Sequence, residues 1–341
     1  MFTVWRDGIR RVWEAPAILL GAWAITLLVS LPFAAAMKEL LQDHLGGSLA
    51  AETAATGVNF NWMEEFTEQA RGLGATFRPA VVGFAAVVDN LSAFLDGDYF
   101  SAGDEGRRHT SVLVGAAAIY VLLWIFLAGG ALDRYARDRV IYAQGFFAAS
   151  GVFFFRFLRL AILMGIVYVF MFGSLHPWMF KTLYPRLTHE ISVERTAAFI
   201  RFAFYALFGG ALIGCNIVFD YAKVRAVVED RRSMLGATTA ALRFVSQNLT
   251  AVLGLYLLNI VMFLVALGAY AVVAPGAGGT GWSMWLGVFV GQLFIVARVW
   301  VKLAFWASET ALFQRRAAHA MYVAAPVTQW PDSPMAESVG R

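Results

Sequence analysis

The chain has 341 residues, of which 60% are hydrophobic and only 15% are charged, and its formal net charge is +4. A soluble globular protein is nearer half apolar and a quarter charged. The composition therefore excludes a soluble globular protein, a disordered chain and a coiled coil, and it predicts an integral membrane protein.

Five long uncharged runs place the membrane-spanning helices. The first four contain 23, 23, 21 and 18 residues, and the fifth contains 54 and is interrupted by the glycine-rich stretch 275–281. Because about 20 apolar residues cross a bilayer, the fifth run holds two helices joined by a tight turn. Barrel strands would alternate apolar and polar residues, which these runs do not. We therefore predict an all-α integral membrane protein with six spans: 15–37, 112–132, 160–180, 199–219, 249–273 and 282–306.

The distribution of lysine and arginine predicts the orientation. With the N-terminus inside, the cytoplasmic segments carry 17 of the 27 basic residues and the outer loops carry 8. The positive-inside rule then places both termini in the cytoplasm. The basic flanks are expected to contact anionic lipid on the cytoplasmic side, and no basic patch with interleaved aromatics predicts nucleic-acid binding.

The segments outside the spans also carry signals. The first apolar run is too long for a cleaved signal peptide, so it is expected to remain as a span. Residues 38–111 form a helical loop on the outer surface, where Asn61 and Glu64 resemble an N-cap with a capping box. Residues 79–95 predict an interfacial helix, with a re-entrant segment as the alternative. Residues 1–316 are expected to form a single membrane domain, and the 317–341 tail is expected to be disordered and cytoplasmic.

The order of elements predicts three repeated two-span units. Each unit begins with an arginine on a surface stretch and ends with an acidic residue after the returning span. The arginines are Arg11, Arg156 and Arg243, and the acids are Asp133, Asp220 and Glu309. From the second unit to the third, the arginine moves from 156 to 243, a shift of 87 residues. The acidic residue that closes the first unit and the one that closes the second, at 133 and 220, are separated by the same 87 residues. Because each unit re-enters on the same side, parallel repeats around an axis normal to the membrane are expected.

Two surface stretches, 141–157 and 233–247, precede the third and fifth spans. We interpret each as an interfacial elbow helix with its apolar face in the membrane and its arginines toward the headgroups. The alternative is an ordinary loop helix packed on the bundle. The expected lipid contacts are Arg156, Arg159, Arg243, Phe147 and Phe154.

The stretch from Phe219 to Lys223, a charged linker, and the sequence from Ala241 to Leu249 that leads into a span resemble a widespread group of bacterial six-span membrane proteins. The group includes the membrane domain attached to some glycerophosphodiester phosphodiesterases. The resemblance covers mainly residues 130–315. It implies a six-span fold in the bacterial inner membrane, and it implies no defined activity.

Motifs for catalysis are not evident in the sequence. No nucleophile elbow, phosphate-binding loop, dinucleotide fingerprint or cysteine pair occurs, and the single cysteine is Cys215. His189, Glu190 and Glu194 could contact a metal, but an exposed polar loop explains them better. We therefore expect no enzyme activity, no cofactor and no metal site.

Charge within the membrane is the strongest candidate for function. Arg298, Lys302 and Glu309 share one face of the sixth span. Charges at bilayer depth need partners, so Arg298 is expected to point into the bundle and to contact Asp220, Asp133 or a cluster of carbonyl groups rather than lipid. This cluster is either a structural set of ion pairs or a site for a substrate, a lipid headgroup or an ion.

Two functions fit these observations. The first is a non-enzymatic accessory or scaffold protein that binds lipid or a membrane partner. The second is a carrier or flippase-like transporter of an amphiphile or anion, with a polar cavity near Arg298 and Lys302. A water-accessible cavity at Arg298 would favour transport, and a closed bundle would favour the accessory role.

Overall fold

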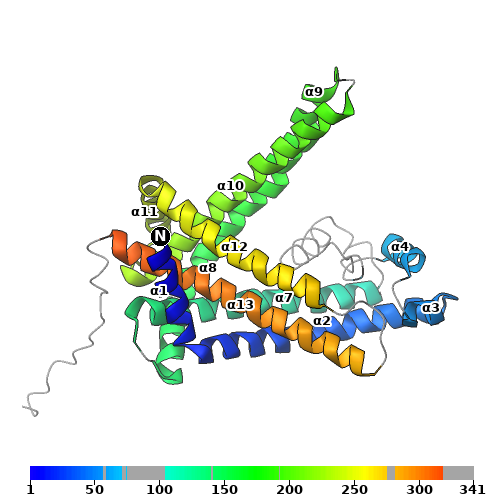
Figure 1. The fold of residues 1–341 in the computed structure, drawn as a ribbon, viewed down its shortest axis with the longest axis horizontal. Coiled ribbons are helices and arrows are strands. Elements are labelled where there is room, and N and C mark those ends of the chain that lie inside the picture. The colour runs from blue at the N-terminus through cyan, green and yellow to red at the C-terminus, as the bar shows by residue number, and fades with distance from the viewer. Residues whose placement is uncertain are drawn as a thin grey trace, which may run out of the picture. The chain divides into compact units, whose positions relative to one another are not determined.

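A computed structural model describes residues 1–56, 59–70, 74, 104–139, 141–191, 193–274 and 281–317. Every regular element among these residues is a helix (Figure 1). In chain order the α-helices are α1 (Phe2–Trp13), α2 (Pro16–Gly46), α3 (Ala51–Thr56), α4 (Phe60–Gln69), α7 (Asp104–Arg137), α8 (Ala143–Phe170), α9 (Tyr184–Thr188), α10 (Glu194–Val228), α11 (Met234–Gln247), α12 (Leu249–Val273) and α13 (Trp282–Arg316). Two π-helical segments, Met171–Leu175 and Trp178–Leu183, lie between α8 and α9.

Six helical stretches are long and apolar enough to cross a membrane, which confirms the predicted number of spans. They are α2, the Ala118–Arg137 part of α7, the continuous Ala143–Thr188 segment, α10, α12 and α13. Helix α12 has the predicted bounds, whereas α7, α10 and α13 extend well beyond the predicted spans. These extensions carry charged residues, so a search for uncharged runs misses them.

The chain divides into two compact units. Unit 1 comprises Met1–Glu14, Ala128–Leu258 and Ala304–Arg341, and unit 2 comprises Ala15–Leu127 and Asn259–Leu303. Unit 1 contains α1, α8, α9, α10 and α11, together with the C-terminal parts of α7 and α13 and the first part of α12. It also holds most of the largest fully buried side chains, among them Tyr135, Tyr221, Phe313, Leu132, Ile217 and Leu255.

Small residues let the helices of unit 1 approach closely. The alanines with no exposed surface are Ala222 and Ala226 on α10, Ala237 and Ala241 on α11, and Ala304, Ala307 and Ala311 on α13. A β-carbon on Gly8 of α1 would lie 2.6 Å from the Cα atom of Ser308 on α13. Glycine at this position is therefore what allows the two backbones to touch.

Helix α1 docks in unit 1 through a buried arginine. Arg11 is only 7% exposed. Its guanidinium donates to the carbonyl oxygen of Tyr135 on α7 at 2.6 Å and to Oε1 of Gln314 on α13 at 2.9 Å. Gln314 in turn donates to the carbonyl oxygen of Ala136 at 2.7 Å. One arginine thus ties the first helix to the ends of the second and sixth spans.

Charged residues along α1 support this docking. Burial raises the pKa of the Asp7 carboxyl, but a hydrogen bond from Arg10 and the charges of Arg11, Arg10 and Arg315 lower it by more, so the pKa lies below its ordinary value. The ionised Asp7 therefore stabilises the fold above that ordinary value, and this contribution is lost as the pH falls through the lowered pKa. The hydrogen bond to Asp138, followed by those to Asp7 and Glu14, raises the pKa of Arg10.

Two aspartates with left-handed backbone follow the second and fourth spans. Asp138, after α7, has φ 47°, and Asp230, after α10, has φ 49°. Asp138 accepts from Arg10 of α1 at 2.7 Å, and Asp230 accepts from Arg156 of α8 at 2.5 Å. Both arginines lie on the helix that begins the same predicted repeat. Each aspartate thus ties the end of a predicted repeat to its beginning.

The stretch 141–157 is not a helix of its own. Helix α8 runs without a break from Ala143 to Phe170, because no capping residue or proline ends it between the surface stretch and the span. The second elbow, 233–247, does correspond to a separate helix. Ser233 caps α11 by accepting from the backbone N–H of Gly236 at 3.2 Å. The depth of both segments in a membrane stays a prediction.

The N-cap of α4 is Asn59 rather than the predicted Asn61. The side chain of Asn59 accepts from the backbone N–H of Trp62 at 3.1 Å, whereas Asn61 lies inside the helix. Both asparagines are good capping residues, and the backbone of Asn59 is the extended one (φ −91°, ψ 104°). The predicted 79–95 helix and residues 318–341 of the predicted tail lie outside the described residues.

Candidate functional site

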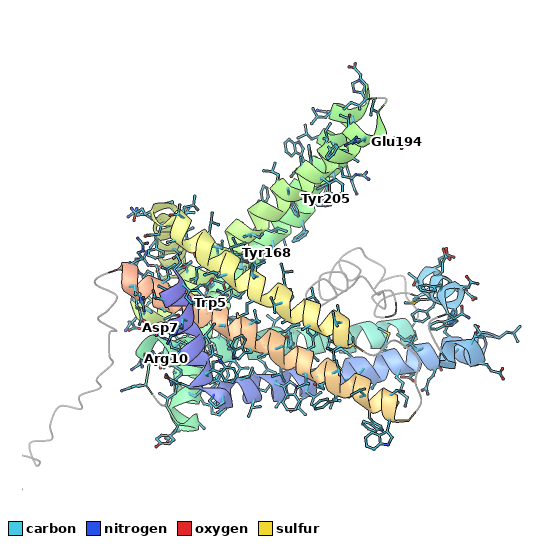
Figure 2. The ribbon with its side chains drawn as sticks, viewed as in Figure 1. Trp5, Asp7, Arg10, Tyr168, Glu194 and Tyr205 are labelled. Atoms are coloured by element: carbon cyan, nitrogen blue, oxygen red, sulfur yellow. The ribbon has the colours of Figure 1, made fainter. Side chains whose placement is uncertain are left out.

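Helix α10 carries a row of polar side chains within an apolar span. Asn216, Asp220 and Lys223 are spaced by four and three residues, which places them on one face of the helix. The hydroxyl of Tyr168 on α8 donates to Oδ1 of Asn216 at 2.8 Å. Figure 2 shows Tyr168 partway along the antiparallel pair formed by α8 and α10. Polar side chains in a span need hydrogen-bond partners from the protein, because lipid chains offer none.

Lys223 and Asp220 form the ion pair of this row. The Nζ atom of Lys223 lies 2.5 Å from Oδ1 of Asp220, and both side chains are largely buried. The same Nζ atom lies 5.7 Å from the ring centroid of Trp306 on α13. The ion pair therefore faces the charged end of the sixth span.

Glu309 lies opposite this pair on α13 and is only 2% exposed. Both of its carboxylate oxygens are buried, and neither has a hydrogen-bond partner among the described residues. Asp220 and Lys223 are close enough to act on its charge. A buried carboxylate without a donor costs roughly several kcal/mol, and Glu309 is the described acid with both oxygens in this state.

Two tyrosines complete the surroundings of Glu309. Tyr221 of α10 is 1% exposed, and its hydroxyl finds no hydrogen-bond partner in the described part of the chain. Tyr256 of α12 packs edge-on against Phe305, with the ring centroids 5.1 Å apart. Both tyrosines lie within electrostatic range of Glu309. We refer to Glu309, Asp220, Lys223 and Tyr221 as the Glu309 cluster.

The three acids predicted to be equivalent have different surroundings. Asp133 is buried and accepts from Arg137, one turn later on the same helix, at 2.8 Å. Asp220 is paired with Lys223, and Glu309 has neither an ion pair nor a hydrogen bond within the described ranges. Their positions at the ends of three spans are alike, and Asp220 acts on the charge of Glu309.

Arg298 and Lys302 belong to unit 2. The guanidinium carbon of Arg298 lies 5.9 Å from the ring centroid of Phe294, and Nζ of Lys302 lies 3.4 Å from that of Trp124. Both cations thus lie near aromatic rings within their own unit. The contact of Arg298 with Asp220 or Asp133, which belong to unit 1, stays a prediction.

The predicted lipid contacts differ in exposure. Arg156 is engaged within the protein, because it pairs with Asp230 and lies 5.2 Å from the ring centroid of Phe153. Arg159 and Arg243 are exposed, Phe147 is exposed, and Phe154 is partly buried. Arg156 is therefore the member of this set with the least freedom to contact a headgroup.

A pocket of about 290 Å³ lies toward the α9 end of the α8–α10 pair. Figure 2 labels two of its lining residues, Glu194 and Tyr205. The guanidinium carbon of Arg201 lies 4.9 Å from the ring centroid of Tyr184, whose hydroxyl donates to the carbonyl oxygen of Ala197 at 3.3 Å. The lining residues are Tyr184, Glu194, Ala197, Ala198, Arg201, Phe202 and Tyr205. We refer to this feature as the Arg201 pocket.

Groups suited to a metal ion are not seen in the part of the chain that the structure describes: no three His, Cys, Asp or Glu side chains come together there. His189 and Glu190 lie 3.4 Å apart and are both exposed. Their surroundings are those of an exposed polar loop.

Sequence reasoning identified Asp220 and Glu309 but missed Lys223, Tyr221 and the Arg201 pocket. The spacing of Asn216, Asp220 and Lys223 was the available signal, because it marks one polar face in an apolar helix. The pocket depends on side chains from both helices of a pair, which spacing within one helix does not reveal.

No family model, curated protein or solved structure matches this chain.

Proposed function

We propose that this chain is a non-enzymatic, multi-pass membrane protein that binds phospholipid, with both termini in the cytoplasm of a bacterium. The six apolar helices support its place in a membrane. The observation that carries lipid binding is the Arg201 pocket, which combines one cation, one anion and aromatic rings on a helix pair rich in exposed apolar side chains.

The charges of the Arg201 pocket match a zwitterionic headgroup. A guanidinium binds phosphate oxygens through several N–H groups, and the Glu194 carboxylate can accept from an ammonium group. The exposed Phe202 and Tyr205 would contact the glycerol and the first acyl carbons. Phosphatidylethanolamine has both groups, whereas phosphatidylglycerol has the phosphate alone. On the cytoplasmic side, the exposed Arg159 and Arg243 are proposed to contact anionic lipid.

Lipid extraction from the purified protein tests this proposal. Replacing Arg201 with glutamine should lower the phosphatidylethanolamine that copurifies in mild detergent by about tenfold, because a charge-assisted hydrogen bond of about 1.5–3 kcal/mol is lost. Mass spectrometry of the extract measures the bound lipid. Arg195→Gln is the matched control, because Arg195 lies over the ring of Phe199 and does not line the pocket.

The variant Glu194→Gln separates the two lipids. It should weaken phosphatidylethanolamine and leave phosphatidylglycerol unchanged, because only the first has an ammonium group. Equal losses in the Arg201 and Arg195 variants, or a purified wild type without phosphatidylethanolamine, would contradict the proposal.

The proposed orientation has its own test. In a Cys215→Ser background, single cysteines at Ser48 and Ser333 should react differently with an impermeant thiol reagent on intact spheroplasts. We expect labelling at position 48 and none at position 333 until the membrane is opened. The reverse pattern would show that both termini lie outside.

The second candidate is a carrier, and the Glu309 cluster is the observation that favours it. Ionisable residues within spans commonly mark ion or proton pathways. Uptake of a lipid or anion into vesicles containing the protein would support a carrier, and loss of uptake in Glu309→Gln would assign the cluster to it. A protein that binds lipid at the Arg201 pocket without uptake has the accessory role.

A further inference from the structure

The Glu309 cluster is not electrically balanced when all its members are ionised. Glu309 and Asp220 supply two negative charges, and Lys223 supplies one positive charge. Lys223 is already within hydrogen-bond distance of Asp220, and the oxygens of Glu309 accept from no group among the described residues. One negative charge is therefore left without compensation in a buried, largely apolar place.

Among the described residues, the cation that acts on the charge of Glu309 is Lys223. From α10 the groups that face it are Asp220, Tyr221 and Lys223, and from α12 it is Tyr256. Helix α11 contributes the ring of Phe244, whose centroid lies 5.2 Å from that of Tyr221. A tyrosine hydroxyl carries no positive charge, so among these groups Lys223 is the cation that offsets the charges of Glu309 and Asp220.

We infer that the Glu309 cluster is a proton-binding site in which Glu309 and Asp220 share one proton and one lysine. In the first state, which has the Lys223–Asp220 pair seen in the structure, Glu309 holds the proton. In the alternative state the Lys223 ammonium pairs with Glu309, and the proton resides on Asp220. The proton count and the net charge of zero are the same in both states, so the exchange needs no other reactant.

The geometry gives each state a physical basis. Two carboxyls near one another cannot both ionise at low cost, and one cation stabilises only the one it contacts. The lysine side chain is long and flexible, which allows its ammonium group to move between them. The unpartnered hydroxyl of Tyr221 lies beside the cluster as a donor for whichever oxygen is exposed by this movement. This inference does not depend on the Arg201 pocket.

Infrared spectroscopy of the full-length protein in nanodiscs tests the site directly. The carbonyl stretch of a protonated carboxyl should be present in the wild type at neutral pH, where exposed carboxyls are ionised. Glu309→Gln should remove this band, because Lys223 and Asp220 then balance one another. Glu229→Gln is the matched control, because Glu229 is a largely buried acid paired with Arg225 and Arg231, and its loss should leave the band unchanged.

The variant Asp220→Asn gives the decisive result. It releases Lys223 to pair with Glu309, so Glu309 should ionise and the band should disappear although Glu309 itself is intact. Lys223→Gln should strengthen the band, because both carboxyls then need a proton. An isolated buried acid would keep its band in Asp220→Asn, and that result would overturn the sharing of one proton.

Two further outcomes would overturn the inference without any variant. The first is a wild-type protein with no protonated-carboxyl band at neutral pH. The second is a band that appears only when sodium is replaced by choline, which would assign the site to a sodium ion. These spectra detect the protonated carboxyl directly and require no transport. Their outcome is therefore independent of whether the chain is a carrier.

Discussion

Replacing Arg11 with methionine is expected to destabilise the protein by about 3–5 kcal/mol, the cost of removing one partner from a buried charged network. The change leaves the carbonyl oxygen of Tyr135 and the side chain of Gln314 without their donor in a buried place. Asp7 also loses one of the cations that keep it ionised. Thermal unfolding in mild detergent measures the loss.

Arg6→Met is the control for the Arg11 variant. Arg6 lies on the same helix, is exposed, and has no interaction that the docking of α1 needs, so its change is expected to stay within about 0.5 kcal/mol. Arg11→Lys should fall between the two, because lysine keeps the charge but lacks the planar fork that reaches two acceptors. Similar melting temperatures for the Arg11 and Arg6 variants would show that the docking of α1 does not depend on the buried arginine.

Replacing Gly8 with alanine is expected to destabilise the protein by about 1–3 kcal/mol, although the same change inside an ordinary helix stabilises by about 1 kcal/mol. The added β-carbon would lie 2.6 Å from backbone atoms of Ser308, which cannot rotate away. Helix α1 must therefore move from α13, and the hydrogen bonds of Arg11 are stretched with it. The sign of the change in melting temperature is the diagnostic measurement.

Two other glycines serve as comparison positions for the Gly8 variant. A β-carbon on Gly130 would meet the Ser150 hydroxyl at 2.5 Å and the ring of Phe146, which are side chains that can shift, so Gly130→Ala should cost less. Gly151 has open space around it, and Gly151→Ala should be neutral or stabilising. If all three variants melt alike, the close contact between α1 and α13 is not what holds α1 in place.

The spans were predictable because lipid imposes one simple rule. A long run of uncharged residues either crosses the membrane or is covered by protein. The runs in this chain are long enough to cross a bilayer as helices. The charged C-terminal extensions of α7, α10 and α13 were not predictable in this way, because they are held by contacts within unit 1. Arg225 shows the difference: its charge suggests a surface linker, yet it donates to the carbonyl oxygen of Ala240 at 2.6 Å and lies beside Phe313.

The candidate site was predictable in part for the same reason. Asp220 and Glu309 were recognised because acidic residues at the ends of spans are conspicuous. Lys223 was overlooked because a lysine three residues after an aspartate at a helix end is typical of a solvated linker. Its burial against Trp306 depends on how α10 packs on α13, which periodicity within either helix does not determine.

The docking of α1 has a consequence for how this protein is made. Arg11 bonds to Gln314, which follows it by 303 positions in the chain. At about 5–20 residues per second, the ribosome supplies this partner about 15–60 s after it has made α1. During that time α1 must wait, and its amphipathic sequence suits it to lie on the membrane surface. Docking of the first helix through Arg11 therefore has to follow the synthesis of α13, the sixth span.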